Sequence, residues 1–277
     1  LFAMMSDVTD EARRAKSFGL LGACIGTGFI LGPAIGGTLA DRTHHSAAVL
    51  GLSCLVLSLV NLALATRFIT AQSAAVVQET PTPTVAPFAF AQRDVRVLLL
   101  SFFLASIAFS CLETTFVRFV TGQMGESQQV AGRLLGWIGI FDVAAQGLLI
   151  RRFANLSNGA WWIVGGMLAH AAVLWTVPFA PLLVPMLVAA AFIGMGQGMY
   201  VPCFSALLSS RSSEQVQGGM LGVIQAQSSL ARVLASFGAN WLFDEVAPWA
   251  TYALASGLMV PALLVFRWGM RLVPAPQ

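Results

Sequence analysis

Long, uninterrupted apolar runs are the feature that most limits what this chain can fold into. Only 10% of its 277 residues are charged and 57% are hydrophobic, whereas soluble domains carry about 25% charged residues. A helix that crosses a bilayer needs about 20 apolar residues, and the runs here have that length instead of the short alternating segments of a β-barrel. The sequence therefore predicts an all-α integral membrane protein. It excludes soluble enzymes, disulfide scaffolds and nucleic-acid partners.

Eight membrane spans are expected. They are placed at residues 17–40, 47–66, 97–119, 131–150, 160–177, 182–208, 217–243 and 249–268. The seventh is the most polar, because Gln225, Gln227, Arg232 and Asn240 interrupt it, so it must line a polar interior if it spans. The four cysteines lie in apolar runs without a C-x-x-C spacing and are interpreted as small core residues.

The basic residues are distributed unevenly between the two sides of the expected spans. One side receives eleven of them, in the segment before the first span, between residues 67 and 96, at 151–152, at 211 and at 267–271. The other side receives Arg42, Arg118 and Arg133. The positive-inside rule makes the richer side cytoplasmic. We therefore expect a multi-pass protein of the cell (inner or plasma) membrane with both ends in the cytoplasm.

An internal repeat accounts for the arrangement of the spans around a Pro/Thr-rich segment. Residues 67–96 contain Thr80-Pro81-Thr82-Pro83-Thr84 and are expected to form a cytoplasmic linker. A shift of 203 residues aligns Leu1–Asp41 with Phe204–Asp244 at eight identities. The pairs include Ala3/Ala206, Ser6/Ser209, Glu11/Glu214, Gly19/Gly222, Ala23/Ala226, Leu31/Leu234, Leu39/Leu242 and Asp41/Asp244.

The repeat indicates that the first two spans correspond to the last two of a six-helix unit. Residues 1–66 are then the end of one half, comprising the end of its fourth helix and helices five and six, and residues 97–277 form a second half with helices seven to twelve. This is a six-plus-six architecture without its first four helices, and the chain starts with Leu1 instead of Met. Parallel six-helix halves are typical of the major facilitator arrangement.

A glycine motif in the first span carries a family resemblance. Residues 28–37 read Gly-Phe-Ile-Leu-Gly-Pro-Ala-Ile-Gly-Gly and fit G-x-x-x-G-P-x-x-G-G. This motif resembles the fifth-helix signature of major facilitator antiporters. Upstream, the segment with Asp7, Arg13 and Arg14 resembles the cytoplasmic loop before helix five in tetracycline and multidrug efflux pumps. The resemblance implies proton-driven export of a small, amphipathic or drug-like solute, with no cofactor.

The same motif has a direct structural interpretation. Gly28, Gly32 and Gly36 would form a groove that admits a neighbouring backbone, while Pro33 bends the helix and Gly37 completes the motif. The groove could equally be a generic packing seam of a membrane bundle. The following Gly37–Arg42 also resembles a cytoplasmic-loop motif of the family, but the distribution of charge places it outside. His44 and His45 are interpreted as solvated loop histidines, with a pH-sensitive pair as the alternative.

Four ionisable residues lie within expected spans, where charge is costly and suggests function. They are Glu113, Asp142, His170 and Arg232. In the family's arrangement, their spans correspond to helices seven, eight, nine and eleven, and helix nine is peripheral. Glu113, Asp142 and Arg232 are therefore expected to converge, and His170 is expected to be a packed or lipid-edge residue.

The family resemblance suggests how these charges would be used. Glu113 or Asp142, with desolvation favouring its neutral form, would take up a proton outside and release it inside, while Arg232 tunes it. The structural alternative is a fixed Asp142–Arg232 ion pair that only joins helices. The proton gradient would then be the energy source.

Polar and aromatic residues on the expected cavity helices are candidates for a substrate surface. Rings and amides suit flat, partly apolar solutes, with attraction of cations by ring faces and acids. The candidates are Phe109, Phe116, Trp137, Phe141, Gln146, Gln197, Tyr200, Gln225 and Gln227.

Two other classes remain open. A membrane enzyme is disfavoured, because the sequence has no H-E-x-x-H, G-x-S-x-G or P-loop motif. A truncated, non-transporting protein that acts as a binding or scaffold remnant is the other alternative. A full-length chain, or another chain, would have to supply the N-terminal helices for transport.

Overall fold

The computed structural model describes residues 11–43, 46–68, 92–150, 152, 158–179, 182–211 and 217–272. Side chains of residues 11–25, 29, 68 and 217–218 are outside this description. The predicted linker therefore lies almost wholly outside the described residues, as do Asp7, His44 and His45. Arg13 and Arg14 are described only as part of a helical backbone.

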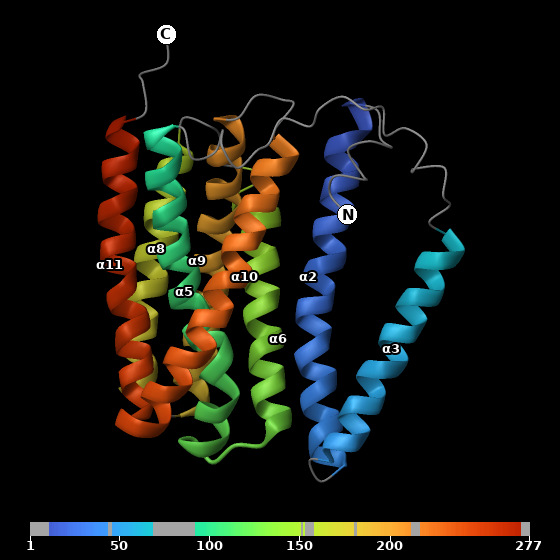
Figure 1. Ribbon diagram of the computed structural model, residues 1–277. Helices are drawn as coiled ribbons and strands as arrows, with labels where there is room; N and C mark the ends of the chain where they lie inside the picture. Colours follow the sequence, from blue (N-terminus) through green and yellow to red (C-terminus); the bar gives the residue numbers. More distant parts are fainter. Residues whose placement is uncertain are drawn as a thin grey trace.

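Eight long helices make up the described part of the chain (Figure 1). They are α2 (Glu11–Arg42), α3 (Ala47–Phe68), α5 (Arg93–Gly122), α6 (Gln128–Ala144), α8 (Gly159–Thr176), α9 (Leu183–Ser210), α10 (Gln217–Trp241) and α11 (Pro248–Leu272). Two of them continue as π-helices, α6 into η2 (Ala145–Ile150) and α10 into η5 (Leu242–Val246), and the 3-10 turn η3 (Val177–Phe179) follows α8. Each expected span is thus confirmed as one helix.

Six of these helices are long and apolar enough to cross a bilayer, namely α3, α5, α6 with η2, α8 with η3, α9 and α11. The eighteen-residue segment of α5 with the highest hydropathy is the most buried of the six, and that of α3 is not buried at all. α10 is not among the six, because a row of polar side chains runs along one of its faces. The polar seventh span is therefore a helix, as predicted, and its polarity needs a polar environment.

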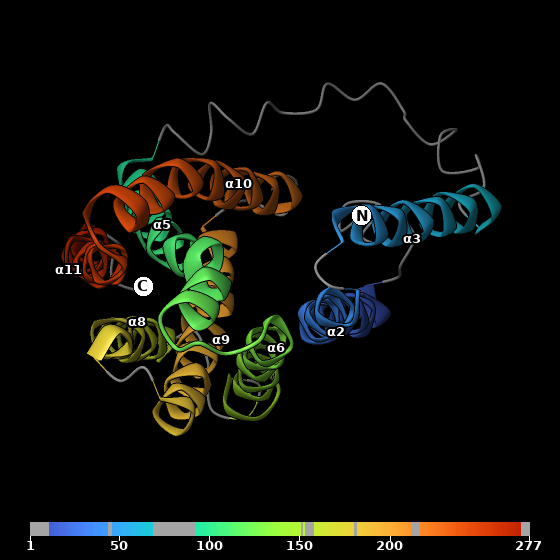
Figure 2. The ribbon, with the colours of Figure 1, turned by 90° about the horizontal axis from the view of Figure 1, so that it is seen from below.

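The helices alternate in direction, so that α2 starts and α11 ends at the same side of the molecule (Figure 1). Six helices, α5 to α11, form one bundle, while α2 packs beside α6 and α3 leans away from the bundle (Figure 2). The described helices thus form a bundle of six with a pair of helices beside it.

The bundle core is built around α5. Phe204 of α9 makes edge contacts with Phe102 of α5 and Phe266 of α11, with ring centroids 5.5 and 5.2 Å apart. A carbonyl oxygen inside a helix can accept a second hydrogen bond besides the helical one. The Ser101 hydroxyl of α5 donates such a bond to the Ala262 carbonyl of α11 at 2.7 Å. Apolar rings and buried hydroxyl bonds thus hold α5, α9 and α11 together.

A seam of small residues joins α2 to α6. A Cβ on Gly37 would fall on the carbonyl of Gln128, and one on Gly132 would fall on the carbonyl of Pro33. Gly136 faces the Ile30 carbonyl in the same way, 3.0 Å from an added Cβ. The two backbones therefore touch, which only glycine permits.

The packing face of α2 is not the one that the motif predicted. Gly28, Gly32 and Gly36 have nothing within 4 Å of an added Cβ in the described part of the chain. At 100° per residue, Gly28 and Gly32 lie about 100° or more from Pro33 and Gly37, whereas Gly36 lies about 60° from Pro33, at the border of the contact face. The predicted groove of Gly28, Gly32 and Gly36 thus meets no neighbouring backbone among the described residues, and the contact with α6 is made through Pro33 and Gly37 instead.

The internal repeat also agrees with the helix boundaries. Displaced by 203 residues, α3 corresponds to residues 250–271, and α11 runs from Pro248 to Leu272. The end of α2 at Arg42 corresponds to residue 245, and η5 ends at Val246. The helices that the repeat pairs are thus of matching position and length.

Candidate proton and solute site in the helix bundle

Glu113 of α5 and Arg232 of α10 form an ion pair. The Arg232 Nε donates to Glu113 Oε2 at 3.1 Å. The Glu113 side chain is 28% exposed and that of Arg232 50% exposed. The sequence analysis expected Glu113, Asp142 and Arg232 to converge, and Glu113 and Arg232 are the two that meet. Their mutual neutralisation also explains how two charges are accommodated in the middle of two long helices.

Arg232 belongs to a continuous polar face of α10. Gln225, Ser229, Arg232, Ser236 and Asn240 follow spacings of four and three residues, which place them on one side of a helix. Internal bonds fix some of them: the Ser229 hydroxyl donates to the Gln225 carbonyl at 3.0 Å, and Asn240 Nδ2 to the Ser236 carbonyl at 2.7 Å. The adjoining face is apolar and exposed, with Val233 and Phe237.

Asp142 lies elsewhere, at the contact between α6 and α9. Its Oδ1 accepts a hydrogen bond from Gln146 Nε2 at 3.1 Å. An added Cβ on Gly198 would lie 2.9 Å from Asp142 Oδ1, and one on Gly194 would lie 3.0 Å from its backbone nitrogen. Among the described residues Asp142 has no ion pair. The proposed Asp142–Arg232 pair is therefore wrong, because Arg232 is engaged by Glu113, and the three charges do not form one cluster.

The start of η2 beside Asp142 departs from regular helix. Residues Ala145–Ile150 form a π-helix, and the Ala145 N–H is shared between the Asp142 and Phe141 carbonyls. Such segments occur frequently at functional sites. Asp142 therefore remains a candidate for proton uptake on grounds of its own surroundings.

Arg118 is a second engaged arginine that sequence reasoning assigned only to topology. Its Nη1 donates to Asn240 Oδ1 at 2.9 Å and to Asp244 Oδ2 at 3.3 Å, and its Nη2 bonds Asp244 Oδ1. Its guanidinium also lies 4.8 Å from the Phe243 ring centroid. Asp244 lies beyond α10, and the hydrogen bond from Arg118 lowers the pKa of its carboxyl. The match of Asp244 to Asp41 in the repeat was the only sequence signal for this cluster.

His170 is fully buried, as the packed interpretation predicted. Its ring contacts Phe109 of α5 and Tyr200 of α9, with centroids 5.9 and 6.0 Å away. Neither ring nitrogen has a hydrogen-bond partner among the described residues. The imidazole thus fills a core position between three helices.

Several expected substrate residues are packed inside the bundle. Phe109, Phe116 and Tyr200 are buried, so they do not line a surface in this conformation. Gln227 points to α5, where its Nε2 donates to the Leu99 carbonyl at 3.3 Å, and the buried Gln197 Oε1 has no described partner. Helical periodicity does not distinguish core from cavity, so the sequence could not show that these side chains lie inside the bundle in this conformation.

The remaining candidates are more accessible. Gln146 and Gln225 are exposed. Trp137 is 38% exposed and makes an edge contact with Phe141 at 5.1 Å between centroids. Gln225 alone among them shares a helix face with Arg232. The residues that the structure brings into contact are therefore Glu113 and Arg232, and Gln225 lies two turns away on the same face of α10.

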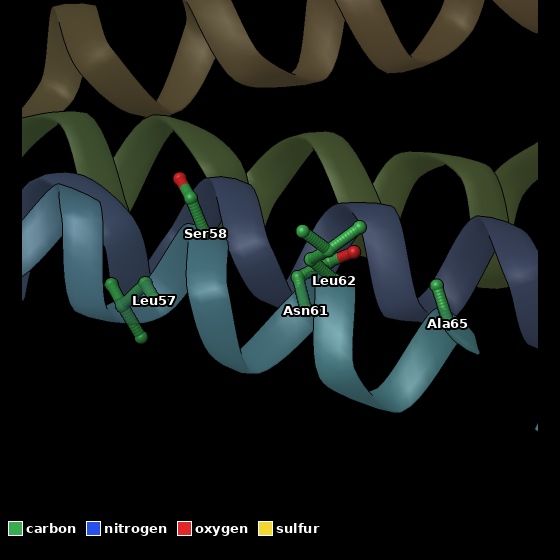
Figure 3. A pocket seen from close by; sticks show the side chains of 5 residues that line it. All are labelled: Leu57, Ser58, Asn61, Leu62 and Ala65. Carbon is green, nitrogen blue, oxygen red and sulfur yellow. The ribbon is translucent and has the colours of Figure 1, made fainter. Parts of the chain in front are cut away.

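A shallow hollow on the surface of the described residues lies away from this site. It is lined by Leu57, Ser58, Asn61, Leu62 and Ala65, all on the outer helix α3 (Figure 3). A hollow bounded by a single helix does not enclose a solute. The ion pair, not this hollow, is therefore the candidate site.

Comparison with known proteins decides the family. The sequence profile of the Major Facilitator Superfamily matches residues 1–236. The chain belongs to the major facilitator superfamily. Membership agrees with the six long apolar helices and with a multi-pass membrane protein.

Similar proteins within the superfamily are drug-resistance proteins. The chain is 27% identical to the class C tetracycline resistance protein of Escherichia coli, over 83% of this chain and 59% of that protein. It is 24% identical to the class H tetracycline resistance protein of Pasteurella multocida, over 94% and 66%. It is also 24% identical to the quinolone resistance protein NorA of Staphylococcus aureus, over 87% and 61%. The chain thus spans about 59–66% of the length of these relatives.

The fold has a counterpart among solved structures. The crystal structure of the human organic anion transporter MFSD10 (TETRAN) matches with a TM-score of 0.70 at 19% identity, over 96% of this chain and 66% of that one. At this identity the likeness concerns the fold alone. The chain is therefore an all-α member of the Major Facilitator Superfamily, and the similar proteins include tetracycline and quinolone resistance proteins.

Proposed function

We propose that this chain takes part in proton-coupled antiport, exporting small, amphipathic, drug-like solutes across the cell membrane, with its ends on the cytoplasmic side. The observation that carries the proposal is the Glu113–Arg232 ion pair between two long helices of a major facilitator bundle. A carboxylate in such surroundings can bind a proton when its basic partner is displaced, and can lose it when the partner returns. The drug-resistance relatives support export as the direction.

Asp142 is the second carboxylate of the proposal. It lies against α9 through Gly194 and Gly198, without a basic partner among the described residues. Protonation of an unpaired carboxylate removes a charge from the close contact between two helices, and loss of the proton puts the charge back and weakens that contact. Two carboxylates in different surroundings thus offer two positions for a proton during a transport cycle.

The test is solute flux in proteoliposomes under an imposed pH gradient. Ethidium and tetracycline are suitable first solutes, because their fluorescence reports export. Glu113→Gln and Asp142→Asn should each lose most of the gradient-driven flux, and the Arg118→Gln variant is the matched control. If both carboxylate variants retain full proton-driven flux, the coupling proposal is wrong.

A further inference from the structure

The Glu113–Arg232 pair leaves hydrogen-bonding capacity unused on both partners. Only Nε of Arg232 and Oε2 of Glu113 take part in the contact. The two Nη groups of Arg232 and Oε1 of Glu113 have no partner among the described residues. The pair thus presents a free guanidinium fork and a free carboxylate oxygen side by side.

Arg118 shows what a saturated arginine looks like in the same bundle. Both of its Nη groups bind acceptors, on Asn240 and Asp244, and an aromatic ring lies against its guanidinium. Arg118 and Arg232 lie on adjacent helices and are similarly exposed, at 44% and 50%. The two arginines therefore differ in how many of their N–H groups are hydrogen-bonded, and only Arg232 has unbonded Nη donors among the described residues.

The free groups have opposite charges: the guanidinium donates hydrogen bonds and the carboxylate oxygen accepts them. A guanidinium fork matches the two oxygens of a carboxylate, and a carboxylate oxygen accepts from an ammonium group. A ligand with only a carboxylate would be repelled by the nearby free oxygen of Glu113, and a ligand with only an ammonium group would be repelled by Arg232. A ligand that carries both charges satisfies both partners, because the pair itself has no net charge.

The surroundings of the pair indicate the rest of the ligand. Gln225 and Ser229 continue the polar face of α10 from Arg232, and the adjoining face exposes Val233 and Phe237. Polar groups beside apolar surface favour an amphipathic body. We propose that Glu113 and Arg232 form a recognition site for zwitterionic amphipathic solutes, with the solute carboxylate on the Arg232 fork and its ammonium group on Glu113. The inference rests on the proposed function and deepens it by naming the solute class.

The site connects recognition to the proposed exchange. A proton and the solute ammonium group would bind the same Glu113 carboxylate, so that one excludes the other. Along the polar face of α10 the described charged groups are Arg232 and, at the far end beyond α10, Asp244, which Arg118 engages. Competition at Glu113 is the exclusion that antiport requires.

The test is equilibrium binding by calorimetry to the purified chain, at one pH and without a gradient. Three probes share one aromatic body: 2-naphthylalanine is the zwitterion, its N-acetyl derivative the anion and its methyl ester the cation. The zwitterion should bind about tenfold more tightly than either derivative, since each derivative loses one charged hydrogen bond. Arg232→Gln should abolish its advantage over the ester, and Glu113→Gln its advantage over the N-acetyl compound.

The control is Arg118→Gln, which should leave the ranking of the three probes unchanged. Arg232→Lys keeps the charge without the fork and should weaken binding of the zwitterion and the N-acetyl compound while sparing the ester. Either derivative binding as tightly as the zwitterion, or no saturable binding of any probe, overturns the inference. Gradient-driven flux that persists in that case leaves the proposed function intact, whereas flux that fails while the ranking holds overturns antiport alone.

Discussion

The carboxylate of Asp41, at the end of α2, accepts a hydrogen bond from the backbone N–H of Gln129 at 2.9 Å, in the first turn of α6. The first N–H groups of a helix have no partner within it. Ser127 satisfies a second one, since its side chain accepts from the Val130 N–H at 3.3 Å. One helix therefore caps another across the seam.

Replacing Asp41 tests this cap. Asp41→Ala should lower the free energy of unfolding by about 0.5–2 kcal/mol, as loss of a capping oxygen does. Asp41→Asn keeps an acceptor and should cost less. Thermal unfolding of the purified protein in detergent measures both, with Ser127→Ala as a comparison. A wild-type melting temperature in Asp41→Ala would show that the bond contributes nothing.

The glycines of α2 should differ sharply in their tolerance of a methyl group. Gly37→Ala places a Cβ on the Gln128 backbone and should destabilise the fold by about 1–3 kcal/mol through overpacking. Gly28→Ala meets open space and should be neutral or slightly stabilising, because alanine favours helix over glycine by about 1 kcal/mol. Melting temperatures of the two variants compare them directly, and equal losses would contradict the α2–α6 seam.

His170 should be replaceable by an apolar residue of similar size. Its two nitrogens are buried without described partners, so His170→Leu removes polar groups that cost free energy and should leave stability unchanged or higher. His170→Ala leaves a cavity and should cost about 2–4 kcal/mol. Thermal unfolding distinguishes the two. A loss in His170→Leu as large as that in His170→Ala would show that the imidazole nitrogens are bonded.

The Arg118–Asp244 contact should respond to acid. Because Arg118 lowers the pKa of Asp244, the contact stabilises the folded state above the usual carboxyl pKa and is lost as pH falls through the lowered value. The effect should be small, since both side chains are about half exposed. Between neutral and acid pH, the melting temperature of the wild type should fall more than that of Asp244→Asn. Parallel curves would contradict the linkage.

Labelling with a membrane-impermeant maleimide tests on which side of the membrane each helix connection lies. In intact cells, Ser46→Cys at the turn between α2 and α3 should be labelled, and Gln92→Cys at the start of α5 should be labelled only after the cells are opened. Both variants are made after Cys54 is replaced by serine, because Cys54 is exposed. The reverse result would invert the orientation inferred from the arginines.

The helices were predictable because a bilayer imposes one length on every apolar run. The contacts between the helices were less predictable. The family's helix order predicted that Glu113, Asp142 and Arg232 would converge, but it did not show which carboxylate meets Arg232. Sequence does not reveal that Gly194 and Gly198 hold α9 against the backbone of Asp142. Phe116 and Tyr200 show the same limit, since a ring at helical spacing fits a core as well as a cavity.

The glycine motif illustrates the difference between a motif and a contact. Its sequence correctly marks α2 as a helix of close approach, yet the touching residues are Pro33 and Gly37, and Gly28 meets nothing in the described residues. Which face is used depends on the partner, here Gly132 and Gly136 of α6. The contact face of α2 is therefore determined by glycines in another span, some hundred residues away in the sequence.

α6 lies between two close backbone contacts, with α2 through Gly132 and with α9 through Gly194 and Gly198. Side chains are also seated against glycines at both contacts, Ile30 of α2 against Gly139 and Asp142 against Gly198, so sliding of α6 along its axis would drive side chains into backbone. Asp142 sits on the α9 side and Gln129 on the end held by Asp41. α6 is therefore fixed in register against both neighbours, and any displacement of Asp142 along the bundle has to carry α2, α6 and α9 together.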